Sequence, residues 1–423
     1  MGDVPAGTMA GHAAMPPDAG AGHHPPQAAS SPPVLVILLA IATFLVQAGF
    51  HGYTAALPLA LARAGEADAT IGLIVGTAAL VQIPAAIAGG RLVDRFGGIR
   101  LFGVGGLAYV LASGILLLPG VEPGGSVLPF ILARALQGMG IAVALPAALS
   151  LVPGIVDPAR LGSALAIVGG AQNLTLVIMP PLSIAILDAG SLDGVAVATI
   201  FFVAAGALLA WRLPIRRVAP VAAPTARRFG ITFRREWTIP LAILITYVAH
   251  WGAVLAYLPV RAAASGADIG LYFTADGIAI FAMRLPSGWL ADRISSRWLL
   301  VAGSAATAVA IGMLLMPLST PLLMLSGFVG GAGGAFVMTP LLLEISRRSS
   351  DADRGSAFAL YSGGLAVALT LGSIGAAPLV AILGLSAALV VGIVLILVSI
   401  ALALWDPSLR TVSRPARRQG PAA

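Results

Sequence analysis

The sequence predicts an all-α membrane protein in which twelve transmembrane helices form two pseudo-symmetric six-helix bundles. Of the 423 residues, 58% are hydrophobic and 10% are charged, and the mean hydropathy is +0.98, far from the balance of a soluble domain. Apolar runs of about 20 residues, the length of a helix that crosses a bilayer, recur along the chain. A charged turn between two such runs returns half a chain later, which indicates a duplicated membrane unit.

The apolar runs favour helices over a β-barrel, because barrel strands alternate apolar and polar residues over about ten positions and these runs do not. Twelve runs have the length and composition of a membrane span. The expected spans cover residues 34–60, 69–90, 99–119, 127–150, 161–184, 194–213, 238–260, 268–290, 298–317, 321–343, 356–378 and 382–404.

The basic residues indicate the orientation of these spans. All 24 are arginines, and most lie in the turns after even-numbered spans or in the C-terminal tail. The opposite side carries only Arg63 and Arg261, while Arg134 and Arg284 fall inside spans. Because cytoplasmic loops carry the excess of basic residues, both termini are expected to be cytoplasmic in a bacterial inner membrane. The net charge of +7 is explained by this topology, so we expect no nucleic-acid partner.

The spans divide the chain into two bundles joined by its only long interior connection, which is rich in arginine. We expect a disordered cytoplasmic tail at 1–33, an N-terminal bundle at 34–213, a basic linker at 214–237, a C-terminal bundle at 238–405 and a second tail at 406–423. The absence of cysteine excludes disulfides and thiolate chemistry.

The N-terminal tail contains histidine and methionine residues that are able to bind a soft metal such as copper. The candidates are Met9, His12 and Met15. An alanine-rich tail that holds these residues by chance explains them better. We therefore expect no metal site and no cofactor.

The repeated turn carries one acid beside arginines at the cytoplasmic end of a span in each half. Its residues correspond at a constant offset of 198: Gly90, Asp94 and Arg95 in the first half, and Gly288, Asp292 and Arg293 in the second. Such an acid can hold the two halves together through charge-assisted hydrogen bonds and helix dipoles. A solvated turn would explain the arginines but not the repeated aspartate, so we expect a gating role.

Three motifs resemble the major facilitator superfamily. The turn Gly90-x-x-x-Asp94-Arg95-x-Gly97 resembles the signature between the family's second and third spans. Residues 132–140 resemble its fourth-span signature, and residues 344–361 resemble the entry of the eleventh span in bacterial metabolite and drug efflux permeases. The fifth span departs from the drug antiporters, because it reads Met179-Pro180-Pro181 where they carry a glycine–proline pair. The resemblance implies alternating access and proton-coupled efflux of a small metabolite or drug-like compound.

Charged groups inside spans are costly and indicate function. Arg134 lies about 11 Å from the outer end of its span and Asp276 is at nearly the same depth, while His51 and His250 lie at about 15 Å. We expect these four groups to form one polar layer that binds substrate or carries protons. Asp276 is the only carboxylate well inside a span, and burial favours its protonated form. We expect Asp276 to couple protons and Arg134 to be its counterpart across the halves, or an anchor for an anionic substrate.

Several polar and aromatic residues are expected to line the cavity, because polar side chains within spans avoid lipid. A histidine on such a helix is often only a hydrogen-bonded packing residue, and the aromatic residues are equally compatible with a lipid-facing or packing role. The cavity candidates are Gln47, Gln137, Gln172, Asn173, Tyr247 and Trp251, with Tyr257 as a further aromatic neighbour.

No phosphate-binding loop or nucleophile motif is present, so an enzyme is not expected. The expected function is proton-coupled efflux by a monomer whose partners are a small-molecule substrate, protons and the lipid bilayer. The alternatives are a proton-coupled uptake symporter, a metal or metal-chelate importer of the same fold, and a non-transporting membrane sensor.

Overall fold

The computed structural model describes residues 33–157, 160–215, 233–291, 293–349 and 354–410, and all regular elements in these ranges are helices. In chain order they are α1 (Pro33–His51), α2 (Ala56–Arg63), α3 (Asp68–Phe96), α4 (Gly98–Leu116), α5 (Leu128–Leu151), η1 (Val152–Gly154), α6 (Leu161–Ala189), α7 (Leu192–Arg212), η3 (Arg235–Trp237), α8 (Thr238–Ala264), α9 (Ile269–Ala291), α10 (Ser296–Met313), α11 (Thr320–Arg347), α12 (Arg354–Thr370), η4 (Leu371–Gly375), α13 (Ala377–Leu383), α14 (Leu385–Trp405) and η5 (Pro407–Arg410). Within the described residues, 12 stretches are long and apolar enough to cross a membrane, which confirms the twelve-helix prediction.

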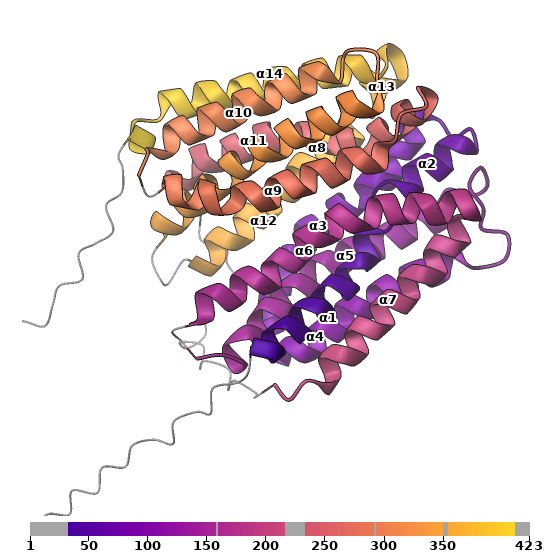
Figure 1. Ribbon diagram of the computed structural model, residues 1–423, viewed down its shortest axis with the longest axis horizontal. Coiled ribbons are helices and arrows are strands. Elements are labelled where there is room, and N and C mark those ends of the chain that lie inside the picture. The colour runs from indigo at the N-terminus through magenta and orange to yellow at the C-terminus, as the bar shows by residue number, and fades with distance from the viewer. Residues whose placement is uncertain (1–32, 158–159, 216–232, 292, 350–353, 411–423) are drawn as a thin grey trace, which may run out of the picture.

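The helices form two halves, α1–α7 and α8–α14, that lie side by side in Figure 1. Helix α3 of the first half packs against α12 of the second, and α6 packs against α9. The start of α1 and the end of α14 lie at the same end of the molecule. The two-bundle prediction is therefore confirmed. The expected tails and linker lie largely outside the described residues, so their boundaries stay a prediction.

Glycines let neighbouring helices approach closely, as is common in membrane bundles. A Cβ atom on Gly138 of α5 would overlap the carbonyl oxygen of Ala78 in α3. A Cβ on Gly331 of α11 would overlap the carbonyl oxygen of Asp276 in α9. These close contacts fix the positions of the helices that carry the polar residues of the membrane interior.

Two spans that were expected to be regular α-helices have an irregular stretch in the structure. The first stops at His51 and resumes as α2 at Ala56, and the eleventh passes from α12 through the π-helix η4 into α13. Irregular backbone at membrane depth is tolerated where protein covers it or where it lines a cavity. In η4 the carbonyl oxygen of Ser373 accepts a hydrogen bond of 2.6 Å from the hydroxyl of Tyr257, so a tertiary contact satisfies it.

The two halves close against each other at the end opposite the arginine-rich turns. Gly72 of α3 packs directly on Tyr257 and Ser373 of the second half. On the other side of the interface, Thr274 of α9 donates a 3.1 Å hydrogen bond to the carbonyl oxygen of Val177 in α6. One apolar cluster includes buried residues from α2, α3, α8 and α9 and so spans both halves. We call this region the outer closure, after the orientation that the arginine distribution predicts.

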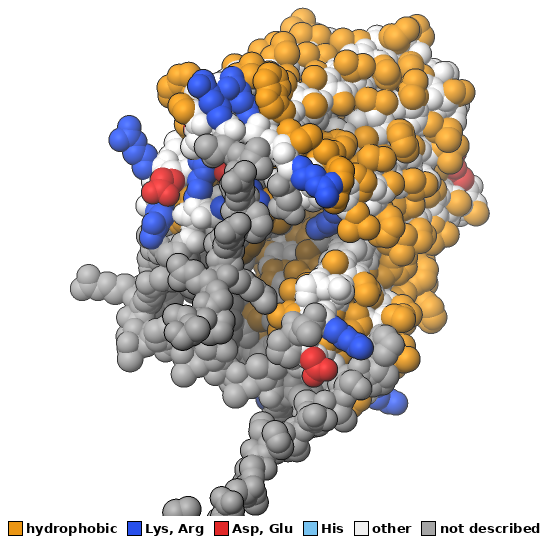
Figure 2. All heavy atoms as spheres, turned by 60° about the vertical axis from the view of Figure 1, so that its left-hand side comes forward, with side chains coloured by type: hydrophobic (Ala, Val, Ile, Leu, Met, Phe, Trp, Pro, Cys, Tyr) orange, Lys and Arg blue, Asp and Glu red, His pale blue; other side chains and the backbone are white. Residues whose placement is uncertain are grey.

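The other end carries most of the described arginines. Figure 2, turned so that this end comes forward, shows basic side chains gathered around a recess between the halves, while apolar side chains cover the flanks. In the second half, Arg348 bonds to the carbonyl oxygen of Glu236 at 3.0 Å, to Glu344 at 3.3 Å and to Ser408 at 2.8 Å. This guanidinium therefore ties η3, α11 and η5 together at the arginine-rich end.

Candidate functional site

A cavity of about 330 Å³ lies between the two halves. Its lining combines aromatic and aliphatic side chains with a few polar groups, as is typical of ligand sites. The lining residues are Phe50, His51, Thr54, Gln82, Ile141, Gln172, Leu176, Tyr247, Val248, His250, Trp251, Leu255, Tyr272, Asp276, Ile280, Thr307, Ile311, Gly330, Gly331, Gly334, Met338, Leu365 and Leu369. Six of the ten residues expected in the membrane interior therefore share one cavity: His51, Gln172, Tyr247, His250, Trp251 and Asp276.

Asp276 is the only acidic side chain among the described residues that line this cavity. It is 2% exposed, and its Oδ2 atom has no hydrogen-bond partner within the described part of the chain. Gly331 of α11 packs against its backbone and offers no side chain to the carboxyl group. A carboxylate so buried is costly while it is charged and unpaired, so a proton or a cation at this position would stabilise the site.

The two histidines line the cavity but have different surroundings. The Nδ1 atom of His250 donates to the carbonyl oxygen of Tyr247, one turn earlier on α8. His51 ends α1 at the break in the first span, and neither of its ring nitrogens has a partner among the described residues. His250 is thus fixed by its own helix, whereas both His51 nitrogens are buried without a partner among the described residues.

Aromatic rings form one wall of the cavity. The rings of Trp251 on α8 and Tyr272 on α9 are stacked, with centroids 6.3 Å apart and an interplanar angle of 27°. The hydroxyl group of Tyr247 lies 2.8 Å from the Thr307 hydroxyl, which holds this ring against α10. Tyr257, expected as part of the same wall, lies instead in the outer closure.

Arg134 is not among the residues that line the cavity. It is 5% exposed and donates hydrogen bonds to Gln137 Oε1 at 2.6 Å and to the Val75 carbonyl oxygen at 2.9 Å. Its guanidinium carbon lies 5.1 Å from the centre of the Phe50 ring, and Phe50 does line the cavity. No ion pair joins Arg134 to Asp276 among the described residues. In this conformation the arginine lies behind Phe50 rather than beside the acid.

The remaining amides also lie outside the cavity lining. Gln47 is fully buried and accepts a 3.3 Å hydrogen bond from the Tyr109 hydroxyl, and Gln137 is the partner of Arg134. The Nδ2 atom of Asn173 is buried, with no partner in the described ranges. The amide of Gln172 is therefore the only one of the four predicted amides that faces the cavity in this conformation.

The gating residues are described only in part. Asp292 lies outside the described residues, and so do the side chain of Asp94 and the surroundings of Gly90. The guanidinium carbon of Arg293 lies 3.6 Å from the centre of the exposed Trp289 ring, and that of Arg95 lies 5.3 Å from the Phe96 ring. Gly288 lies within helix α9. The gating role of the repeated turns stays a prediction.

Sequence reasoning missed several residues of the site. Phe50, Tyr272 and Thr307 line the cavity, and only Tyr272 had a visible signal in the sequence. Tyr272 precedes Asp276 by one helical turn, which places both on the same face of α9. The glycine-rich run of α11, which contributes Gly330, Gly331 and Gly334, was a further signal that this helix approaches its neighbours closely.

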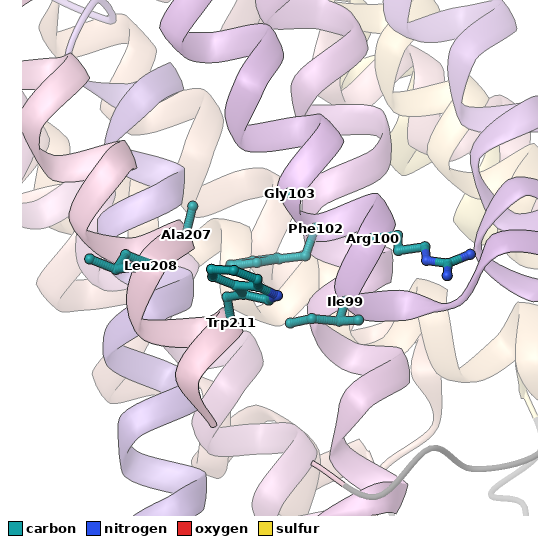
Figure 3. A pocket seen from close by; sticks show the side chains of 7 residues that line it. All are labelled: Ile99, Arg100, Phe102, Gly103, Ala207, Leu208 and Trp211. Atoms are coloured by element: carbon teal, nitrogen blue, oxygen red, sulfur yellow. The ribbon is translucent and has the colours of Figure 1, made fainter. Parts of the chain in front are cut away.

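A larger groove lies away from this cavity, between α4 and α7 near the arginine-rich end. Figure 3 shows the side chains of Ile99, Phe102 and Trp211 beside one another, while Arg100 points away from them. Trp211 and Leu208 are exposed, and the groove holds no acidic or histidine side chain. Its residues fit the membrane-facing surface of the bundle, so this groove is not the candidate substrate site.

The described residues contain no group of three or more His, Cys, Asp or Glu side chains that could hold a metal ion. Met9, His12 and Met15, the weak metal candidates, lie outside the described residues. Asp276, His51 and His250 share a cavity without forming such a group.

Several solved structures resemble this chain in fold. A point mutant of the nucleoside transporter NupG matches with a TM-score of 0.71 and 14% identity, over 89% of this chain and 100% of that one. Another structure of NupG matches with a TM-score of 0.66 and 15% identity over 88% and 97% of the two chains. The human organic anion transporter MFSD10 (TETRAN) matches with a TM-score of 0.62 and 15% identity over 87% and 98%.

Sequence comparisons identify the family. A segment of 86 residues is 42% identical to the Puromycin resistance protein pur8 of Streptomyces alboniger, but it spans only 20% of this chain and 16% of that protein. The sequence model of the Major Facilitator Superfamily matches residues 39–265 and again 251–423, so it covers nearly the whole span-containing region in two repeats. The chain therefore belongs to the Major Facilitator Superfamily.

Proposed function

We propose that this transporter exports a small organic molecule across the bacterial inner membrane in exchange for protons. The observation that carries the proposal is the buried and unpaired carboxyl group of Asp276 in a cavity between the two halves. A coupled transporter needs a group whose charge state changes during the cycle and which meets the substrate at the same place. Asp276 is the described acidic group that satisfies both conditions.

The surroundings of Asp276 leave its carboxyl group free to exchange partners. Helix α8 presents Tyr247 and His250, α1 presents His51, α10 presents Thr307, and α11 presents glycines, while Tyr272 lies one turn before it on α9. None of these is a permanent cation that would hold the carboxylate ionised. A bound proton and a bound substrate can therefore replace each other at this group, and competition of this kind links their movements in opposite directions.

Efflux is preferred over uptake for two reasons. Two motifs resemble those of efflux permeases, and an 86-residue segment is 42% identical to a protein named for puromycin resistance. The geometry of the cavity itself is compatible with a proton-coupled symporter, which is the alternative that the transport assay must separate. The absence of a three-ligand metal group within the described residues gives the metal importer no comparable support.

The experiment that tests this function uses everted vesicles from cells that make the protein, with an acidic interior and a pH-sensitive dye. A transported compound from a metabolite and drug panel is expected to accumulate inside and to dissipate the proton gradient. Vesicles from cells that lack the protein provide the baseline. Accumulation that requires the reversed gradient would identify an uptake symporter, and accumulation that ignores the gradient would contradict proton coupling.

The arginine-rich end is proposed to face the cytoplasm, with both termini on that side. Reporter enzymes fused after Gly65, in an outer turn, and after Leu213, at the end of α7, check this orientation. An alkaline phosphatase reporter is expected to be active after Gly65 and inactive after Leu213. Activity at both positions would overturn the topology. One chain is expected to suffice for transport, since a single chain supplies the whole cavity lining, and light scattering of the purified protein checks its monomeric state.

A further inference from the structure

We propose that the cavity selects organic cations that carry a planar aromatic group, with Asp276 recognising the charge and the rings of Trp251 and Tyr272 recognising the aromatic body. This inference rests on the proposed function, because it assigns the cavity to the transported molecule. It goes further by naming the chemistry of that molecule, which family membership leaves open.

The charge of the cavity lining favours a cation. Asp276 is the only acidic side chain among the described lining residues, and no arginine is among them. The other titratable side chains of the lining are His51, His250, Tyr247 and Tyr272. A ligand ammonium that approaches Oδ2 would supply the partner that this buried atom lacks within the described chain.

An anion would find no arginine among the described residues of the lining. Arg134 was the residue expected to anchor an anion, but its hydrogen bonds go to Gln137 and to the Val75 carbonyl oxygen. The Phe50 ring lies over its guanidinium, 5.1 Å from the ring centre to Cζ, and presents an aromatic group to the cavity. The contacts of the arginine are therefore with residues of the N-terminal half, and its guanidinium is not part of the cavity lining.

The aromatic side chains favour a planar body next to the charge. Trp251 and Tyr272 are stacked at 6.3 Å, and Phe273 meets the Trp251 ring edge-on at the same distance, which fixes the indole plane. Tyr272 lies one turn from Asp276 on α9, so ring and carboxyl group share a helix face. An aromatic cation can thus stack on the rings while its charge meets the carboxylate and the ring faces, both of which attract cations.

The glycines of α11 provide the necessary space. Gly330, Gly331 and Gly334 line the cavity without side chains, and Gly331 brings α11 directly against the Asp276 backbone. The cavity of about 330 Å³ is within the range of small-molecule sites. A ligand with a fused ring system and a short amine arm suits a site of this size and composition.

Three probes with one aromatic body separate charge from shape: naphthylmethylammonium, naphthylmethanol and naphthoate. Equilibrium binding of each is measured on the full-length protein in lipid nanodiscs, with empty nanodiscs as the baseline. The cation is expected to bind about tenfold more tightly than the neutral alcohol, and the carboxylate is expected to bind most weakly. Cyclohexylmethylammonium, which keeps the charge without the aromatic ring, is expected to bind more weakly than the naphthyl cation.

Three variants assign the preference to the named residues. Asp276→Asn is expected to lose the preference for the cation and keep its affinity for the alcohol, which also shows that the variant is folded. Asp276→Glu is expected to restore part of the preference. Trp251→Leu is expected to weaken all three naphthyl probes by a similar factor. Tightest binding of naphthoate, or an Asn variant that still prefers the cation, would overturn the inference.

This binding assay is independent of direction and of proton coupling. If the cation preference holds while vesicles show no proton exchange, the substrate class stands and proton-coupled efflux fails. If proton-coupled efflux is observed but only for anions or neutral compounds, the function stands and the substrate class fails.

Discussion

Replacing Asp276 by asparagine is expected to abolish the concentration of substrate against a gradient while sparing exchange of substrate at zero gradient. The amide retains the shape of the side chain but neither binds nor releases a proton. Without that exchange, proton movement no longer drives the empty and loaded states around the cycle. The measurement compares gradient-driven accumulation with radiolabelled substrate exchange in the same proteoliposomes. For a cationic substrate the exchange is followed at a raised concentration, because the variant is expected to bind it more weakly.

The matched control for this experiment is Asp188→Asn. Asp188 is an exposed acid that forms a 2.7 Å ion pair with Arg63 at the end of the first half opposite the arginine-rich turns. Exposed pairs of this kind contribute on the order of 0–1 kcal/mol, so its neutralisation is expected to leave gradient-driven transport close to that of the unmodified protein. If Asp276→Asn still concentrates substrate, the acid is structural. His51, whose ring nitrogens lack partners among the described residues, and His250 then become the leading proton sites.

The sequence was sufficient to predict the spans and the two-fold organisation, because each depends on a local pattern of residues that can be recognised along the chain. A run of apolar residues spans the bilayer whatever its neighbours are. The turn around Asp94 and its counterpart at Asp292 revealed the duplication. The position of a residue along its helix could also be predicted from the sequence. Three of the four groups expected at one level share the cavity: His51, His250 and Asp276.

The direction in which a side chain points around its helix axis was harder to predict from the sequence. Arg134 has the depth of Asp276, but its guanidinium is turned toward α3 and the Gln137 side chain, and Phe50 lies between it and the cavity. Tyr257 lies near the aromatic residues in sequence and yet belongs to the outer closure. Both outcomes depend on packing against helices that are distant in sequence, which a hydropathy pattern does not contain.

The breaks in the first and eleventh spans also escaped the sequence analysis. No proline lies between His51 and Ala56 or within η4. Their backbone groups are satisfied by contacts such as that of Ser373 with Tyr257. These irregular stretches lie at the interface of the halves, where alternating access requires a change of shape. The local sequence favours a continuous helix there, whereas the packing of the two halves favours an irregular backbone.

Replacing Gly72 by leucine is expected to open the outer closure and stop transport. A Cβ atom at this position would overlap the Tyr257 hydroxyl and lie 2.9 Å from the Ser373 carbonyl oxygen, which belong to the other half. Overpacking of this kind costs about 1–3 kcal/mol. Because the cost applies only while the halves are closed at this end, it shifts the equilibrium toward states open to the outside by about 5- to 150-fold.

The natural absence of cysteine makes this shift directly measurable. Leu255→Cys places one thiol in the cavity lining on the outer part of α8, and a membrane-impermeant maleimide is added to intact cells. Labelling is expected to be slow in the otherwise unmodified protein and at least about fivefold faster with Gly72→Leu, in proportion to the open population. Gly72→Ala is expected to give an intermediate rate, because its Cβ atom alone already meets Tyr257.

Gly114→Leu is the matched control, since a Cβ atom there would meet nothing within 4 Å. Gly114→Leu is expected to leave labelling and transport unchanged. Gly72→Leu and Gly114→Leu should both elute from a sizing column as monodisperse protein. Asp94→Asn tests the opposite end in the same assay. If the repeated aspartates hold the arginine-rich end closed when the outside opens, their loss favours the inward-open state, so Leu255→Cys labelling should be no faster than in the parent. Unchanged labelling with Gly72→Leu in a folded protein would show that the contact of Gly72 with Tyr257 and Ser373 does not seal the cavity.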